Sequence, residues 1–243
     1  MNAETPQTVE LSLPQAFLLL ATNDEDGKPE VPVFALRTTV AGAILAELDL
    51  LGAIELQGKH VRATGATPET ELQHELEAIR GKSRPHSPRR WVSMLEGRAE
   101  VQSVYEGMVS AGLVEHMGEK HLGRIRAVRY PEKDHAPEAA LLEKIRTALR
   151  GSPSDLQPPE TGAEDAGTSE TKAPGSAKPA SNKPDNRTLA LIALLQAAGL
   201  LGKLFPEADR VRAGELAKGY WPSRAVEDEL RMIRLGEQEA ATL

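Results

Sequence analysis

The chain has 243 residues, a formal net charge of -7 at pH 7 and no cysteine. Without cysteine, disulfides, thiolate metal sites and cysteine nucleophiles are all excluded. Hydrophobic residues make up 40% of the sequence but aromatic residues only 3%, so we expect an aliphatic and mostly helical core. The negative net charge argues against bulk attraction to nucleic acid or anionic lipid, so any such binding needs a local basic patch.

The N-terminal part predicts a short helix followed by an acidic turn. Ser12 is a favourable N-cap, Pro14 suits the opening turn, and a leucine-rich run at 17–20 follows. Polar residues at 23–27, ending in glycine, predict a turn that stops this helix. Two prolines then predict that residues 28–39 are not helical.

The next stretch predicts the helix around which the core forms. Between Val40 and Leu51, large aliphatic residues recur at helical spacing, and alanines among them keep the surface thin enough for another helix to approach closely. Gly52 is placed to end the helix with a positive φ. Residues 54–64 predict a β-hairpin, with Gly58-Lys59 as its turn.

Residues 67–130 alternate between helical patterns and turn signals. A helix followed by a glycine and a two-stranded wing, the pattern near the end of this region, is typical of a winged-helix fold. The predicted elements are a helix from 67 to 81, a carboxylate-free basic loop at 82–91, an apolar helix at 92–95, an amphipathic helix at 101–109, and strands at 113–117 and 122–130 around a turn at 118–121.

The C-terminal half is divided by a segment of biased composition. Residues 151–186 hold six prolines and many small or polar residues, and we predict a disordered linker because such a segment buries too little apolar surface to fold. A helix with inward-facing leucines precedes it. The run at 189–205 is apolar all round and predicts a buried central helix, because Gln196 and Lys203 interrupt it too early for a membrane span. Two closing helices are predicted at 207–220 and 222–235.

The sequence Ala-Gly-Ala-Ile-Leu-Ala-Glu-Leu-Asp-Leu-Leu-Gly-Ala-Ile-Glu-Leu at 41–56 resembles the signature helix of the Golgi phosphoprotein 3 family. Arg129-Tyr130-Pro131 at the exit of the second hairpin and the late Leu-Ala-Leu-Ile run agree with that family's order. The resemblance implies a mainly α, single helical domain with short β-hairpins. This domain would comprise residues 8–150 and 187–238, with a winged-helix-like hairpin near 113–130 and the linker as an insertion.

The resemblance also implies a function. Members of this family are phosphoinositide-binding peripheral membrane adaptors, so we expect a non-catalytic protein that binds anionic lipid headgroups of the phosphatidylinositol 4-phosphate type. We expect a cytoplasmic protein, peripheral at the membrane, because the first residues lack a secretory signal. A protein cargo or a second copy of the chain is an expected partner, and nucleic acid and a transmembrane segment are not.

The family's headgroup residues are a tryptophan before the central helix, an arginine in its first turn, and two arginines near the helix that precedes the hairpin. In this sequence the corresponding positions hold Pro32, Ala41, Arg98 and Val101, so only Arg98 matches. Convergent arginines can still bind phosphate bidentately. We therefore predict a lipid-phosphate site at Arg37, Arg84, Arg90, Trp91 and Arg98, and a membrane-contacting hairpin at Met117, Leu122, Arg124 and Arg126, of which the two arginines would share one face.

Three alternatives remain open on the sequence alone. A winged-helix DNA-binding regulator is the main one, opposed by the net charge and by a helix at 101–108 without lysine or arginine. The hairpin histidines His116 and His121 could face a metal, although solvent exposure is the default, and we predict no metal or other cofactor. Glu47 could be a perturbed acid, but a residue that pairs inside the core is favoured, and no catalytic motif is present.

Overall fold

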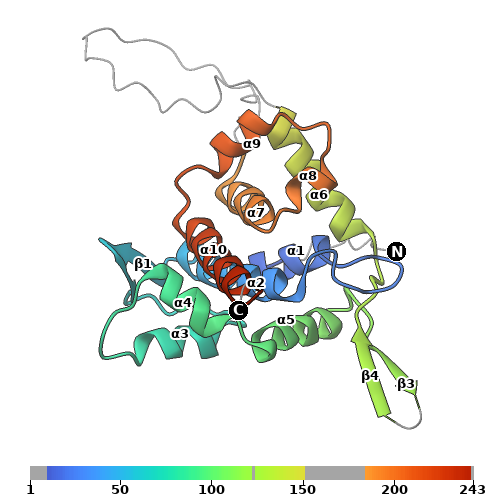
Figure 1. Ribbon diagram of the computed structural model, residues 1–243, viewed down its shortest axis with the longest axis horizontal. Helices are drawn as coiled ribbons and strands as arrows, with labels where there is room; N and C mark the ends of the chain where they lie inside the picture. The colour runs from blue at the N-terminus through green and yellow to red at the C-terminus, as the bar shows by residue number, and fades with distance from the viewer. Residues whose placement is uncertain (1–9, 122–123, 151–183, 242–243) are drawn as a thin grey trace, which may run out of the picture.

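The computed structural model describes residues 10–121, 124–150 and 184–241, with the backbone alone at 119–121, 124–127 and 241. The predicted linker therefore lies outside the described residues except for its last three positions. Of these, Asp185 is the N-cap of a helix and accepts a hydrogen bond from the Thr188 N–H. The described part is mainly α-helical, with two separate two-stranded antiparallel sheets (Figure 1).

The centre of the core is helix α2, which is surrounded by three helices from both ends of the chain. Leucine and alanine side chains of α2 are almost completely buried, as the thin apolar surface predicted. The four helices are α1 (Leu13–Leu20), α2 (Val33–Leu50), α7 (Asn186–Ala197) and α10 (Trp221–Ala241). Segments on either side of the undescribed stretch thus share one apolar cluster.

Helix α2 starts seven residues before the position that the sequence predicts. Pro32 is its N-cap, and both prolines precede the helix, where a missing N–H and a fixed φ do no harm. The expectation that residues 28–39 are non-helical is therefore wrong from Val33 onward. At the other end, Gly52 has φ +66° and terminates the helix as predicted.

Gly42 lets α10 approach α2 closely. A Cβ atom at this position would lie 2.1 Å from Val226 Cγ2 of α10, well inside van der Waals contact. Leu194 of α7 approaches the same point to 3.5 Å. The close helix contact predicted for this surface is therefore present, and its partner is the last helix of the chain.

The first hairpin and the three helices after it cover one side of α2. The hairpin pairs as predicted, and Gly58 in its turn has φ +62°. Helix α4 begins at Pro88, so Arg89, Arg90 and Trp91 belong to this helix and not to the predicted basic loop. The elements are β1 (Ile54–Gln57), β2 (His60–Ala63), α3 (Gln73–Arg80), α4 (Pro88–Leu95) and α5 (Arg98–Ser110).

The second hairpin, β3 (Met117–His121) with β4 (Arg124–Arg129), extends away from the helices (Figure 1). Residues 118–121, predicted as its turn, belong to β3 instead, because His121 pairs with Arg124. The exit of the hairpin is fixed to the acidic turn, since the Tyr130 N–H donates to the Gly27 carbonyl at 3.3 Å. Gly27 has φ +62°, and a Cβ there would lie 2.6 Å from the Tyr130 nitrogen.

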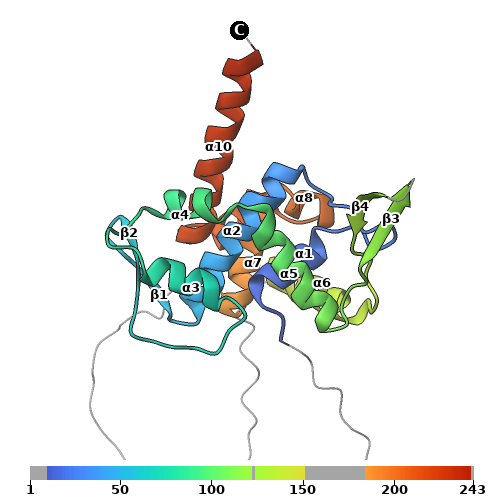
Figure 2. The same ribbon diagram turned by 90° about the horizontal axis from the view of Figure 1, so that it is seen from below.

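The C-terminal half contains more breaks than the sequence predicts. The run at 189–205 is two helices, because Gly199 with φ +75° separates α7 from α8 (Leu201–Leu204). Helix α10 projects from the body of the molecule (Figure 2). Among the described residues, no helix is long and apolar enough to span a membrane. The remaining helices are α6 (Ala136–Arg150) and α9 (Arg210–Ala217).

Glu47 joins the two ends of the chain through an ion pair in the core. Its side chain is 6% exposed, and Arg187 of α7 binds it bidentately, with Nη1–Oε2 at 2.6 Å and Nη2–Oε1 at 3.0 Å. The Leu13 N–H of α1 donates to the same carboxylate at 2.8 Å. Glu47 is thus a pairing residue of the core, as favoured from the sequence.

Candidate headgroup-binding surface

The basic segment before α4 is held in place at several points. The Val61 N–H of β2 donates to the His86 carbonyl at 2.9 Å, and Ser87 caps the helix by accepting from the Arg90 N–H at 3.3 Å. Trp91 is 2% exposed and lies edge-on to the His86 ring, with 5.7 Å between centroids. Trp91 therefore anchors α4 in the core and cannot contact a headgroup, which corrects its predicted place in the site.

Arg84 and Arg90 are exposed at the start of α4. Their side chains form no hydrogen bond or ion pair with any residue that the structure describes, whereas the neighbouring Arg89 binds Glu229 of α10 at 3.0 Å. The backbone bond at His86 and the buried Trp91 anchor the stretch of chain between and beside these two arginines. This arrangement is suited to an anionic partner.

Arg37 and Arg98 lie near the opposite end of α4. Thr38 donates to Glu96 Oε2 at 2.8 Å, and burial raises the pKa of the Glu96 carboxyl while the charge of Arg37 opposes this shift. Arg37 is half-buried, and its positive charge partly neutralises the nearby Glu96 carboxylate. Arg98 is exposed at the first position of α5, and its charge partly opposes the rise in the pKa of Tyr130 that burial causes.

The four predicted arginines lie near the two ends of α4, and their convergence on one phosphate stays a prediction. Arg84 and Arg90 lie at the start of α4, Arg37 and Arg98 beyond its end, and eight helical residues span about 12 Å. The separation arises because Arg90 belongs to the helix, which the sequence-based prediction of a loop at 82–91 did not provide for.

Acidic side chains occupy the space beside Arg37 and Arg98. The Glu100 carboxylate lies against Gly97, the N-cap of α5, so close that a Cβ on Gly97 would be 2.0 Å from Glu100 Oε2. Glu96, the C-cap of α4, directly precedes Gly97. The N-terminus of α5 is thus already covered by a carboxylate of its own helix, which favours the Arg84 and Arg90 group for anion binding.

The predicted membrane-contacting hairpin is described only in part. Met117 is 55% exposed at the start of β3. Leu122 lies outside the described residues, as do the side chains of Arg124 and Arg126. The strand register shifts between Glu119 and Lys120, so that Arg126 has no partner across the hairpin. Simple alternation, on which the shared face of the two arginines was predicted, does not apply across such an irregularity.

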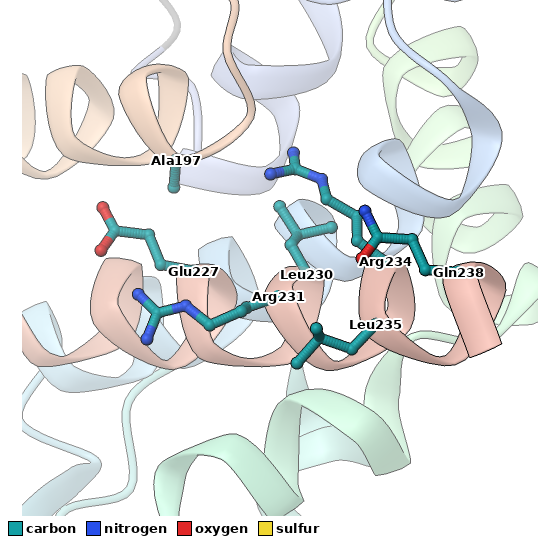
Figure 3. Close-up of a pocket in the computed structure, with 7 residues that line it drawn as sticks. All are labelled: Ala197, Glu227, Leu230, Arg231, Arg234, Leu235 and Gln238. Atoms are coloured by element: carbon teal, nitrogen blue, oxygen red, sulfur yellow. The ribbon is translucent and has the colours of Figure 1, made fainter.

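A shallow hollow of about 300 Å³ lies beside α10. Its lining comes from the projecting half of α10 and from the end of α7 (Figure 3). Arg231 and Arg234 contribute positive charge there, but Glu227 offsets one of them, and none of the predicted site residues reaches it. No pattern in the sequence predicts this hollow, because it forms where two separate helices meet.

The family model for Golgi phosphoprotein 3 (GPP34) matches residues 13–233, which is most of the chain. The chain belongs to the Golgi phosphoprotein 3 family. The match includes the central helix α2, both hairpins and the helices on either side of the undescribed stretch. A comparison with individual curated sequences found no match. Membership supports an adaptor of the Golgi phosphoprotein type, and the described structure agrees in being mainly α-helical.

Two of the family's headgroup positions are buried in this member of the Golgi phosphoprotein 3 family. Ala41 is 0% and Val101 is 9% exposed, so neither position presents a cation or a polar group to solvent. Pro32 is exposed but carries no aromatic ring. Among these positions, Arg98 alone offers an exposed guanidinium, and any headgroup recognition in this chain must use other residues as well.

Proposed function

We propose that this protein is a peripheral adaptor that binds anionic lipid headgroups through Arg84, Arg90 and Arg98. These three residues are called the headgroup surface below. The observation that carries the proposal is that Arg84 and Arg90 are exposed, free of ion pairs with described residues, and mounted on a segment fixed by Trp91. Arg37 contributes positive potential behind this surface but is partly neutralised by Glu96.

A surface of separated arginines binds a charged membrane differently from a pocket. Each cation near an anionic surface contributes about 1 kcal/mol, and the contributions fall off within a Debye length. The rest of the protein is repelled, since its formal net charge is -7. Binding by this mechanism depends on the density of negative charge at the membrane surface. A membrane rich in phosphatidylinositol 4-phosphate has a high charge density because each headgroup carries an extra phosphate. The exposed Met117 would add an apolar contact at the interface.

The test is co-sedimentation of the full chain with vesicles of neutral phosphatidylcholine, with or without anionic phosphatidylserine or phosphatidylinositol 4-phosphate at equal total charge. We expect binding to the anionic vesicles at low salt, loss of binding at high salt, and no binding to the neutral ones. The triple variant R84E/R90E/R98E loses at least three favourable cations, or about 3 kcal/mol, which corresponds to roughly 100-fold weaker binding.

The control is R210E/K218E, whose two substitutions lower the net charge by 4, where the three of the triple variant lower it by 6. Both residues are exposed on or beside α9, at the opposite end of the molecule from α4 (Figure 1). This variant also becomes more negative, so it reports the effect of net charge alone. If the control loses as much binding as the triple variant, the surface is not specific. If the wild-type protein ignores anionic vesicles at low salt, the proposal fails for this chain.

A further inference from the structure

Four side chains that do not belong to the headgroup surface meet where the acidic turn, the hairpin exit and α6 come together. Asp24 lies in the turn, Glu132 and His135 follow the hairpin, and Glu138 lies in the first turn of α6. One ligand atom from each residue lies within 4.8 Å of all the others. His135 Nδ1 is 2.5 Å from Glu132 Oε2 and 3.7 Å from Asp24 Oδ2.

Glu132 provides a second and independent observation. Its side chain is only 3% exposed, and its Oε1 atom is buried with no hydrogen-bond partner among the described residues. A buried carboxylate oxygen without a donor or cation is costly, so native structures rarely leave one. The two oxygens of a carboxylate are about 2.2 Å apart by covalent geometry, so this free oxygen borders the cluster that its other oxygen joins.

The charges of this cluster are not balanced by the protein. Within the described residues, Asp24, Glu132 and Glu138 form no ion pair with lysine or arginine, and their cationic partner is His135. The fold thus holds three carboxylates around one imidazole, an arrangement that a divalent cation would neutralise.

We propose that Asp24, Glu132, His135 and Glu138 form a binding site for a divalent first-row metal ion such as Zn²⁺ or Mn²⁺. Three carboxylate oxygens and one imidazole nitrogen are ligands that these ions accept, whereas Ca²⁺ prefers oxygen alone. Binding of the ion would release the proton that His135 Nδ1 and Glu132 Oε2 share, and these two atoms, 2.5 Å apart without the ion, would separate to about 3 Å as both became ligands. It would tie the acidic turn to the root of the hairpin and to α6, and so fix the direction in which the hairpin leaves the body.

The test uses the full chain without an affinity tag, after treatment with a chelator, and no lipid, so its result is independent of the proposed function. Zn²⁺ binding is measured by titration calorimetry and Mn²⁺ binding by loss of the free-ion signal in electron paramagnetic resonance. We expect one ion per chain, at least tenfold weaker binding in H135A and in E138Q, and a higher melting temperature with metal only in the wild type and controls.

The matched controls are E143Q, an exposed glutamate on the same helix α6 that pairs with Arg146, and H74A, an exposed histidine on α3. Both should bind as the wild type does. Circular dichroism of H135A and E138Q shows whether they fold, and both positions are outside the core. The proposal is overturned if the wild type binds neither ion at millimolar concentration, or if H135A and E138Q bind as tightly as the controls.

Discussion

Replacing Gly42 by alanine tests the close contact between α2 and α10 directly. The new Cβ would lie 2.1 Å from Val226 Cγ2, and Val226 is fully buried. Carbon atoms in contact are about 3.5–4.0 Å apart, so the helices must separate by more than 1 Å or Val226 must leave its rotamer. Overpacking of this kind costs about 1–3 kcal/mol, and the better helix propensity of alanine offsets roughly 1 kcal/mol of it.

We therefore expect Gly42→Ala to lower the free energy of unfolding by up to about 2 kcal/mol. For a chain of this size, that is a fall in melting temperature of up to roughly 8 °C. Thermal unfolding followed by circular dichroism measures it. Gly236→Ala is the matched control, since Gly236 is also inside a helix but a Cβ there meets nothing within 4 Å.

The sign of the change decides the outcome. Gly236→Ala should raise the melting temperature, because only helix propensity changes. A double variant that adds Val226→Ala to Gly42→Ala should be at least about 1 kcal/mol more stable than the sum of the two single changes, since the second removes the clashing methyl group. If Gly42→Ala is as stabilising as Gly236→Ala, α2 and α10 are not packed as the structure has them.

Three further predictions concern the core. Leu48→Ala and Leu194→Ala should each cost roughly 2–5 kcal/mol in urea unfolding, because both side chains are 0% exposed, and a negligible cost at both would contradict the central pair of helices. Arg187→Ala should cost about 3 kcal/mol by leaving the Glu47 carboxylate without its cation, whereas a loss below about 0.5 kcal/mol would mean that the pair is dispensable. Burial raises the pKa of Tyr105 from 10.0 to about 12. Only the unfolded phenol then ionises as the pH rises above 10, so stability should fall between pH 10 and 12, and Tyr105→Phe should reduce that fall in melting temperature. If the melting temperature of Tyr105→Phe falls with pH between 10 and 12 as much as that of the wild type, this prediction is wrong.

The positions of most helices and of both hairpins could be predicted because their signals are local. Apolar spacing marks the buried sides of α1, α2 and α5, and Gly52 and Gly112 end helices with φ +66° and +74°. A glycine that relieves a positive φ acts within its own turn, so its effect is visible in the sequence. Ser12 is the N-cap of α1 as predicted, because a capping residue also acts within the first turn of its own helix.

Errors in the prediction arose where a local signal had two meanings. Proline is unfavourable in a helix interior but favourable at its first positions. The prolines before Val33 therefore predict a non-helical segment, whereas Pro32 is in fact the N-cap of α2. The apolar run at 189–205 suited one long helix, but Gly199 breaks it. Trp91 was assigned to a binding loop, while packing against the core buried it in α4.

The candidate sites depended on contacts that no local pattern contains. Glu47 and Arg187 are 140 positions apart, and their ion pair exists because α7 packs beside α1 and α2. The metal-site residues Asp24 and Glu138 are likewise on segments that meet only when the hairpin exit folds onto the acidic turn. The sequence by itself determined most of the elements and the supply of arginines. The tertiary structure decided which charges are paired, because pairing depends on distances between segments that periodicity along the chain does not specify.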